Sequence, residues 1–312
     1  MMNKYNRNKY LFSTIFVAFA ITSLAFTACS SAPKRPAEIR TKRNAAIEQL
    51  ELANHAVLER EEDVAHLFLS EAWRLAVSTD DPDTRTRILL AIGNAWYSAG
   101  QSSRAIDYWK QALDEAKKAN LTMLTAASRI HIARGNLAEG QHVPDMPASE
   151  RVARAKESRS IALEAQPFLT KNLLYSAFAW RVLGLSEKEL GNTEKALNAL
   201  SKAIDSHTSK QYLEDAAYDW YLTGSVYSKA ERYDEALNAL EKALAFDRRA
   251  ENSAGLGQTW MAIGHVHNKA GNIAEARNAW TRSRDIFNAT FLMRLAQDAE
   301  LLITGLEASP QS

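Results

Sequence analysis

Residues 220–243, WYLTGSVYSKAERYDEALNALEKA, decide the fold, because the same arrangement returns along the chain. In residues 180–203 and 260–283, too, a tryptophan is followed four residues later by a glycine, and twelve residues after that by an alanine. Six small residues, separated by 40, 40, 51, 40 and 40 positions, mark the recurrence: Ala53, Gly93, Ala133, Gly184, Gly224 and Gly264. This spacing indicates one structural unit repeated six times, with an insertion of 11 residues in the third copy.

Each copy contains two groups of apolar residues at the i, i+3, i+4, i+7 spacing of an amphipathic helix. A short turn separates the groups, and Gly191 and Gly271 stand in two of these turns, where helix ends favour glycine. The pattern predicts a hairpin of a helix A and a helix B in every copy. We expect the small residue of helix A and the first alanine of helix B to let the two backbones approach closely. The low glycine and proline content, 12 and 7 residues, also favours an all-α chain.

The hairpin pattern resembles the tetratricopeptide repeat family, whose signature is W-x₂-L-G-x₂-Y followed by A-x₃-F-x₂-A. Repeat four carries it clearly: Trp180, Leu183, Gly184, Gly191, Ala196, Leu200 and Ala203. The resemblance covers residues 40–288 and implies a right-handed α-solenoid of six hairpins. The 40-residue period exceeds the family's usual value of about 34, and the added residues lie at the junctions between repeats. We therefore expect helix B and the following helix A to be longer by nearly one turn each.

Three segments depart from the repeat. Residues 141–151 form the insertion, which we interpret as a surface loop or, alternatively, as a flap that contacts a partner; its two prolines disfavour a helix. Arg159 stands where helix B of repeat three should have a bulky apolar residue, so the phase of that helix stays open. Residues 289–307 are predicted to form a capping helix that covers the last repeat, before a tail at 308–312.

The N-terminal residues predict export and lipid anchoring. Residues 1–28 combine a basic start with a short apolar run and read as a signal peptide. The run ends at Cys29, the single cysteine of the chain, in a context similar to the lipobox of bacterial lipoproteins. That resemblance implies lipid attachment at Cys29, a stalk over residues 29–39 and, because Ser30 follows, an outer-membrane protein facing the periplasm. The alternative is an uncleaved membrane anchor with an incidental cysteine.

Composition and motifs point away from enzymes, cofactors and nucleic acid. The formal net charge is +1, without the basic excess of a nucleic-acid binder. The 7 histidines are scattered, and His265 and His267 are too close in a helix to share one metal ion. No glycine-rich phosphate loop is present. We predict a non-enzymatic protein with no cofactor and no metal.

A concave groove lined by the A helices is the site that the resemblance implies. The positions that line it in tetratricopeptide solenoids correspond here to aromatic, polar and cationic residues: Asn94, Tyr97, Arg134, Phe178, Arg181, Lys188, Tyr218, Tyr221, Ser225, Lys229, His265, Asn268 and Lys269. Aromatic and arginine anchors are typical of protein–protein sites. Asn54 and Asn94 stand at carboxylate-clamp positions, but Leu50 and Leu90 replace the accompanying lysines, so we do not expect a true clamp.

These observations predict a membrane-anchored scaffold that binds a protein or peptide partner in its groove, within a cell-envelope complex. An alternative is a lipoprotein of the same repeat class that binds a small ligand and partners a solute-uptake system. The sequence leaves the partner and the oligomeric state open.

Overall fold

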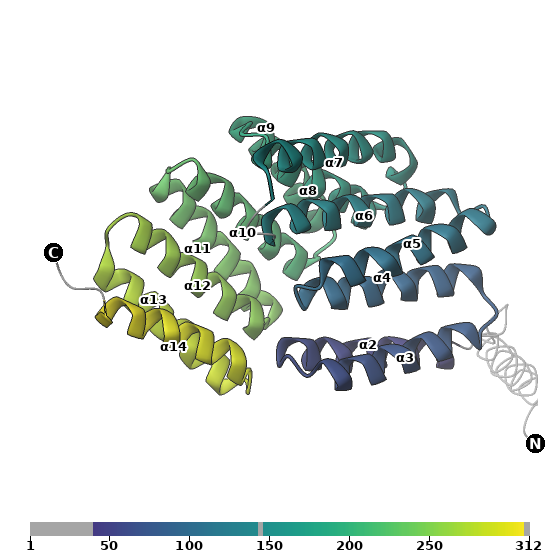
Figure 1. Ribbon diagram of the computed structural model, residues 1–312, viewed down its shortest axis with the longest axis horizontal. Coiled ribbons are helices and arrows are strands. Elements are labelled where there is room, and N and C mark those ends of the chain that lie inside the picture. Colours follow the sequence, from purple (N-terminus) through teal and green to yellow (C-terminus); the bar gives the residue numbers. More distant parts are fainter. Residues whose placement is uncertain (1–39, 143–145, 309–312) are drawn as a thin grey trace, which may run out of the picture. The chain divides into compact units, whose positions relative to one another are not determined.

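The computed structural model describes residues 40–142 and 146–308 of the chain, and the described residues from Lys42 onward belong to one compact unit. Every regular element in the described residues is an α-helix (Figure 1). The helices are α2 (Thr41–Leu58), α3 (Glu62–Val77), α4 (Pro82–Ser98), α5 (Ser102–Lys118), α6 (Thr122–His142), α7 (Ala148–Leu169), α8 (Leu173–Glu189), α9 (Thr193–Ser209), α10 (Leu213–Lys229), α11 (Tyr233–Ala250), α12 (Ser253–Lys269), α13 (Ile273–Ala289) and α14 (Met293–Ala308). The expected all-α solenoid of helical hairpins is confirmed.

The hairpins stack so that their A helices form a row. From α3 onward each helix packs against the next one in the chain, as Figure 1 lets the reader follow. In addition, α4, α6, α8, α10 and α12 each contact the neighbouring A helix of the row. Residues on that row from successive repeats therefore come together on one wall, although they are about 40 positions apart in the sequence.

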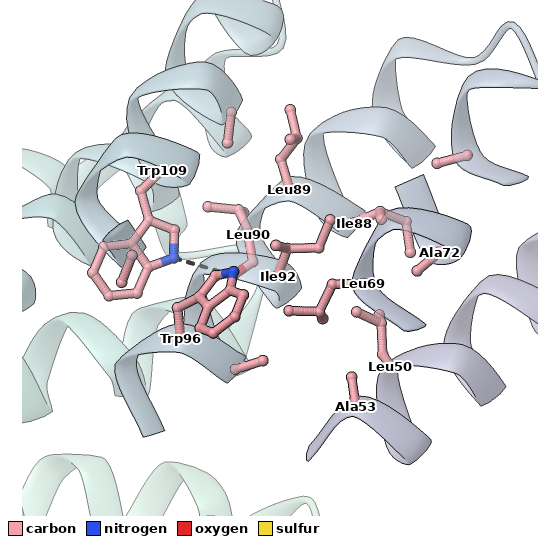
Figure 2. Packing of buried hydrophobic residues seen from close by; sticks show 14 of the residues in the cluster. Leu50, Ala53, Leu69, Ala72, Ile88, Leu89, Leu90, Ile92, Trp96 and Trp109 are labelled. Carbon is pink, nitrogen blue, oxygen red and sulfur yellow. Dashed lines mark hydrogen bonds between the residues drawn. The ribbon is translucent and has the colours of Figure 1, made fainter. Parts of the chain in front are cut away.

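Small residues in the A helices make the hairpins tight. A side-chain carbon at Gly184 would lie 2.8 Å from Leu200, and one at Gly224 would lie 2.8 Å from Leu240. In two other repeats a tryptophan of helix B takes the place of the leucine: Trp109 covers Gly93, and its indole nitrogen donates to the carbonyl of Leu90 at 3.1 Å (Figure 2). Steric exclusion at the crossing therefore explains why the small residue recurs.

In repeat three, most of the described residues between 141 and 151 are helical, whereas the sequence predicted a loop there. Helix α6 continues through Gly140 to His142, and α7 already begins at Ala148. Most of the inserted residues in the described part therefore lengthen the two helices. Pro147 does not interrupt α7, because it occupies the N-cap position, where its missing N–H group costs no helical hydrogen bond. Residues 143–145 lie outside the described part.

The structure also settles the phase of helix B in repeat three. Ala155, Ser158 and Ala162 are buried, and the Ser158 hydroxyl donates to the Ala133 carbonyl at 2.9 Å. Arg159 lies at the edge of this face, where its Nε atom pairs with the buried carboxylate of Glu187 at 3.1 Å. An ion pair replaces the apolar contact that the other repeats make at this position.

Helix α14 follows the sixth hairpin and covers α13. Leu292 and Ala296 are buried in a cluster with Phe287, and Ile303 is buried with Trp280. The preceding helix α13 extends to Ala289, so the covering helix begins at Met293, four residues after the expected start. Within the described residues, no helix combines the length and apolar character needed to cross a membrane. Cys29 and the predicted signal and stalk segments, 1–28 and 29–39, lie outside the described residues.

Candidate functional site

A half-open cavity of ≈ 710 Å³ lies along the row of A helices. Most of its lining residues come from α4, α6, α8, α10 and α12, and Leu58 at the end of α2 and Ser102 at the start of α5 also line it. Seven of the thirteen residues predicted from the sequence lie on its wall: Tyr97, Arg134, Arg181, Lys188, Tyr218, Tyr221 and Ser225. The tertiary structure thus brings together residues of four successive repeats.

The other six predicted residues do not line this cavity. Asn94 and Phe178 stand behind the wall, in contact with Arg134. Lys229 is exposed and pairs with Glu189 at 3.1 Å. The remaining three, His265, Asn268 and Lys269, are exposed in the last two turns of α12. The cavity meets α12 nearer its start, at Asn252 and Gln258, and this explains why these three residues are separate from it.

Arg134 is held by aromatic rings on the cavity wall. Its guanidinium carbon lies 3.8 Å from the ring centre of Tyr97, 5.1 Å from that of Phe178 and 5.4 Å from that of Trp109. One terminal nitrogen is 3.5 Å from the Asn94 side-chain oxygen, and the buried Nε atom has no hydrogen-bond partner among the residues that the structure describes. Burial lowers the pKa of Arg134, yet an arginine stays charged at neutral pH. The wall therefore contains a partly desolvated cation.

Arg181, only 5% exposed, has a different role from the one predicted. Its Nε atom donates to Asp219, and one terminal nitrogen donates to the Asp215 carboxylate at 3.0 Å. Burial alone would lower the pKa of Arg181, but the carboxylates of Asp219 and Asp215 outweigh it and raise that pKa. The sequence prediction treated Arg181 as a free anchor for a partner, whereas its donors already serve this internal network.

Two histidines complete the polar interior. The fully buried His207 of α9 places its Nδ1 atom 2.6 Å from the second carboxylate oxygen of Asp219. His131 of α6 lies between Trp109 and Phe178, with ring centres 5.2 and 4.4 Å away. Burial, and then the charges of Arg134 and Arg181, place the pKa of His131 well below its ordinary value. His131 is therefore neutral at physiological pH and adds no charge to the wall.

Tyrosines and a lysine form the rest of the wall. The rings of Tyr218 and Tyr221 stack at 5.9 Å between centres, and Arg181 lies 5.0 Å from the ring centre of Tyr218. Lys188 donates to the Ser225 hydroxyl at 2.7 Å. Burial lowers the pKa of Lys188; Glu189 opposes this shift, while Lys229 and Lys269 add to it. The arrangement offers flat aromatic surface beside fixed positive charge.

Sequence reasoning missed Asp215, Asp219, His207 and His131. Asp215 and Asp219 are four residues apart on one helix face, a weak signal that a cation packs between them. Nothing in the sequence marks His207 as their partner, because it comes from the preceding hairpin. In the described part of the chain, no group of three or more His, Cys, Asp or Glu residues is placed to hold a metal ion.

Comparison with known proteins supports the repeat class. Residues 217–289, which cover most of repeats five and six, match the family model described as tetratricopeptide repeat. No curated protein matches the chain. The fold is similar to a Rap protein complexed with Competence and Sporulation Factor, with a TM-score of 0.53 and 15% identity over 84% of this chain and 75% of that one. It is also similar to the apo form of RapI, with a TM-score of 0.53 and 14% identity over 96% and 94%. These two likenesses concern the fold.

The fold and the match together define the class of this protein. It is an all-α solenoid of helical repeats, and the family model supports the tetratricopeptide repeat class for it. Proteins of this build present a continuous surface made from successive repeats, and such surfaces serve in binding.

Proposed function

We propose that this protein is a non-enzymatic scaffold that holds a segment of a protein partner in the cavity of its A helices. The observation that carries the proposal is the cavity itself, which combines Tyr97, Tyr218 and Tyr221 with the aromatic-held Arg134. Tyrosine and arginine dominate the binding energy of protein interfaces, because they bury large rigid surfaces and keep polar ends for hydrogen bonds. The volume of ≈ 710 Å³ suits a few side chains of an extended segment better than a whole folded domain.

The test is co-purification of partners from cells that express tagged variants. We expect Tyr218→Ala with Tyr221→Ala to abolish recovery of a partner that the wild type captures, because the stacked pair is removed. Phe168→Ala is the matched control: it removes an aromatic ring that is 54% exposed on α7, outside the cavity. Equal recovery by the double variant and the wild type would exclude the cavity as the binding site.

Anchoring at the cell envelope is the second part of the proposal. It rests on the pattern of residues 1–28 and on Cys29, as the sequence presents them. Acylation of Cys29 would hold the solenoid at the periplasmic face of the outer membrane, within reach of a cell-envelope complex. Metabolic labelling with an alkyne analogue of palmitate, in a diderm bacterial host, tests this directly. We expect label and membrane fractionation for the wild type and neither label nor processing for Cys29→Ser; an equally labelled variant would contradict the proposal.

Binding of a small organic acid, within a solute-uptake system, is a second candidate function. The unpartnered Nε atom of Arg134 beside a cavity of this volume favours it. A thermal-shift screen separates the two functions, because a bound metabolite raises the unfolding temperature in the absence of any protein partner.

A further inference from the structure

We propose that Arg134 is a carboxylate-recognition residue, and that the partner segment places an acidic side chain or a terminal carboxylate against it. The inference rests on the proposed function and specifies the chemistry of the partner. It also assigns a ligand-binding role to Arg134 and an internal structural role to Arg181. Arg134 and Arg181 line the same cavity, yet they differ in how many of their N–H donors are still available to an incoming anion.

The two arginines differ in how many of their donors are used. Arg181 donates to two carboxylates and to a backbone carbonyl, that of Asp215. Within residues 40–142 and 146–308, Arg134 forms no ion pair; its single polar contact is the 3.5 Å approach to Asn94. Arg134 is half-buried, and its buried Nε–H group has no partner among the described residues, which costs free energy in the unliganded protein. A carboxylate that enters the cavity would remove that cost.

The aromatic rings around Arg134 fix the direction from which the carboxylate must come. The guanidinium carbon of Arg134 lies over the Tyr97 ring, 3.8 Å from its centre, and 5.1 Å from the ring centre of Phe178. A ring stacked on a guanidinium covers a face of the planar group, whereas the N–H donors of that group point outward in its plane. Two N–H groups on one edge of a guanidinium can donate to both oxygens of a carboxylate, which forms a short charge-assisted pair. The rings therefore preorganise Arg134 without satisfying its hydrogen bonds.

The other charges on the wall do not exclude an anion. Asp215 is committed to Arg181, and Asp219 is shared by Arg181 and His207. His131, which lies between the rings of Trp109 and Phe178, is neutral at physiological pH. The remaining acid of the wall, Glu214, is exposed to solvent. The stacked Tyr218 and Tyr221 rings offer a place for an apolar or aromatic neighbour of the carboxylate in the same segment.

The experiment measures selectivity for the carboxylate with matched peptides. The purified solenoid is applied to arrays of N-acetylated hexapeptides in which each glutamate peptide has a glutamine counterpart, and each free C-terminus an amidated one. We expect the wild type to prefer the charged member of the best pairs by about tenfold or more. The glutamine pairs test an acidic side chain and the amidated pairs test a chain terminus.

Variants assign the preference to Arg134. Arg134→Gln should bind both members of a pair equally, and Arg134→Lys should keep the charge but lose most of the selectivity, because it lacks the planar fork. Lys229→Gln, an exposed cation outside the cavity, should leave selectivity unchanged. If Arg134→Gln does not fold, Arg134→Lys still decides, since it must select less strongly than the wild type.

Three outcomes overturn the inference. In the first, Arg134→Gln is as selective as the wild type, while Tyr218→Ala with Tyr221→Ala abolishes binding; Arg134 then has no role in carboxylate recognition, and the proposed function stands. If Arg134→Gln does not fold, the same conclusion follows from Arg134→Lys. If the wild type retains no peptide at all, both fail. In a parallel thermal-shift arm, stabilisation by 10 mM phenylacetate but not by phenylacetamide, without any peptide binding, would assign the site to a small acid and refute a peptide partner.

Discussion

At the scale of single residues, the charged side chains of the interior fall into two kinds. Some, such as Arg181, form ion pairs within the fold, whereas Arg134 forms none in the described residues. Arg181, Asp219 and His207 come from three consecutive helices, and Asp219 pairs with both of the other two in the interior. Such a network contributes less to net stability than its contacts suggest, because desolvation of the ions is costly. Removal of one member is different, since it leaves an unpaired buried charge.

We predict that Arg181→Met destabilises the protein by about 3–5 kcal/mol, because the buried Asp219 carboxylate would lose its arginine partner and keep only the contact with His207. Urea unfolding followed by circular dichroism at pH 7.5 measures the effect. Lys229→Met is the matched control and should cost at most about 1 kcal/mol, because its pair with Glu189 is exposed on the lysine side. Similar losses in the two variants would contradict the structural role of Arg181.

Asp247 gives the chain a pH-dependent stability. Its carboxylate is 2% exposed and accepts from Asn252 at 2.8 Å and Thr259 at 3.4 Å. Burial raises the pKa of Asp247 to about 6, from 3.8, against the opposing effect of these two hydrogen bonds. Because the folded state holds the proton more tightly, this group stabilises the fold fully below pH 3.8 and loses that contribution as the pH rises through 6.

We therefore predict that Asp247→Asn is more stable than the wild type at pH 7.5, by about 1–2 kcal/mol, and that the difference shrinks toward zero near pH 4. Unfolding temperatures across pH 4–8 measure this. Asp114→Asn, at an exposed position of α5, should show no such trend. A pH-independent difference for Asp247→Asn would show that the buried carboxylate does not titrate as described.

At the scale of elements, each hairpin depends on a close crossing of its two helices. Trp280 covers Gly264 and donates from its indole nitrogen to the Met261 carbonyl at 3.1 Å, as Trp109 does in repeat two. Since the indole is 2% exposed and held by this bond, it has no free space to move into. Helix propensity and packing therefore oppose each other at this glycine, and packing prevails.

Two glycine-to-alanine substitutions in helices test this, with opposite expected signs. Gly264→Ala should destabilise the protein by about 1–3 kcal/mol, because the new methyl group overlaps Trp280. Gly305→Ala in α14 should stabilise it by about 0.5–1 kcal/mol, because no atom of the described residues lies within 4 Å of the new carbon and alanine favours the helix. Chemical denaturation of the pair gives the comparison; stabilisation by Gly264→Ala would refute the crossing.

At the scale of the whole molecule, a stack of repeats needs cover on its terminal faces, because every hairpin relies on its neighbours to bury apolar surface. Helix α14 supplies this cover for Trp280 and Phe287 of α13. Its two faces differ sharply: Ile303 is 7% exposed, whereas Leu301, two residues earlier, is 63% exposed.

We predict that Ile303→Asp detaches α14 and exposes α13, because a carboxylate cannot be buried there without a partner. Hydrogen exchange over residues 293–308 should accelerate, and binding of the dye ANS should rise. Leu301→Asp, which adds the same charge to the exposed face, should change neither reading. Unchanged protection in Ile303→Asp would mean that α14 does not act as a cap.

The sequence by itself determined the repeated hairpin, because a small residue at the helix crossing and apolar spacing along both helices are local requirements that every copy must meet separately. It also placed Tyr97, Arg134, Tyr218 and Tyr221 on the inner row. Helix ends in repeat three were less certain, since a proline at an N-cap and one inside a helix look alike until the hydrogen bonds are known. Only the tertiary structure distinguished Arg181, paired with two aspartates, from Arg134, held by aromatic rings, because a buried charge is defined by neighbours from other hairpins.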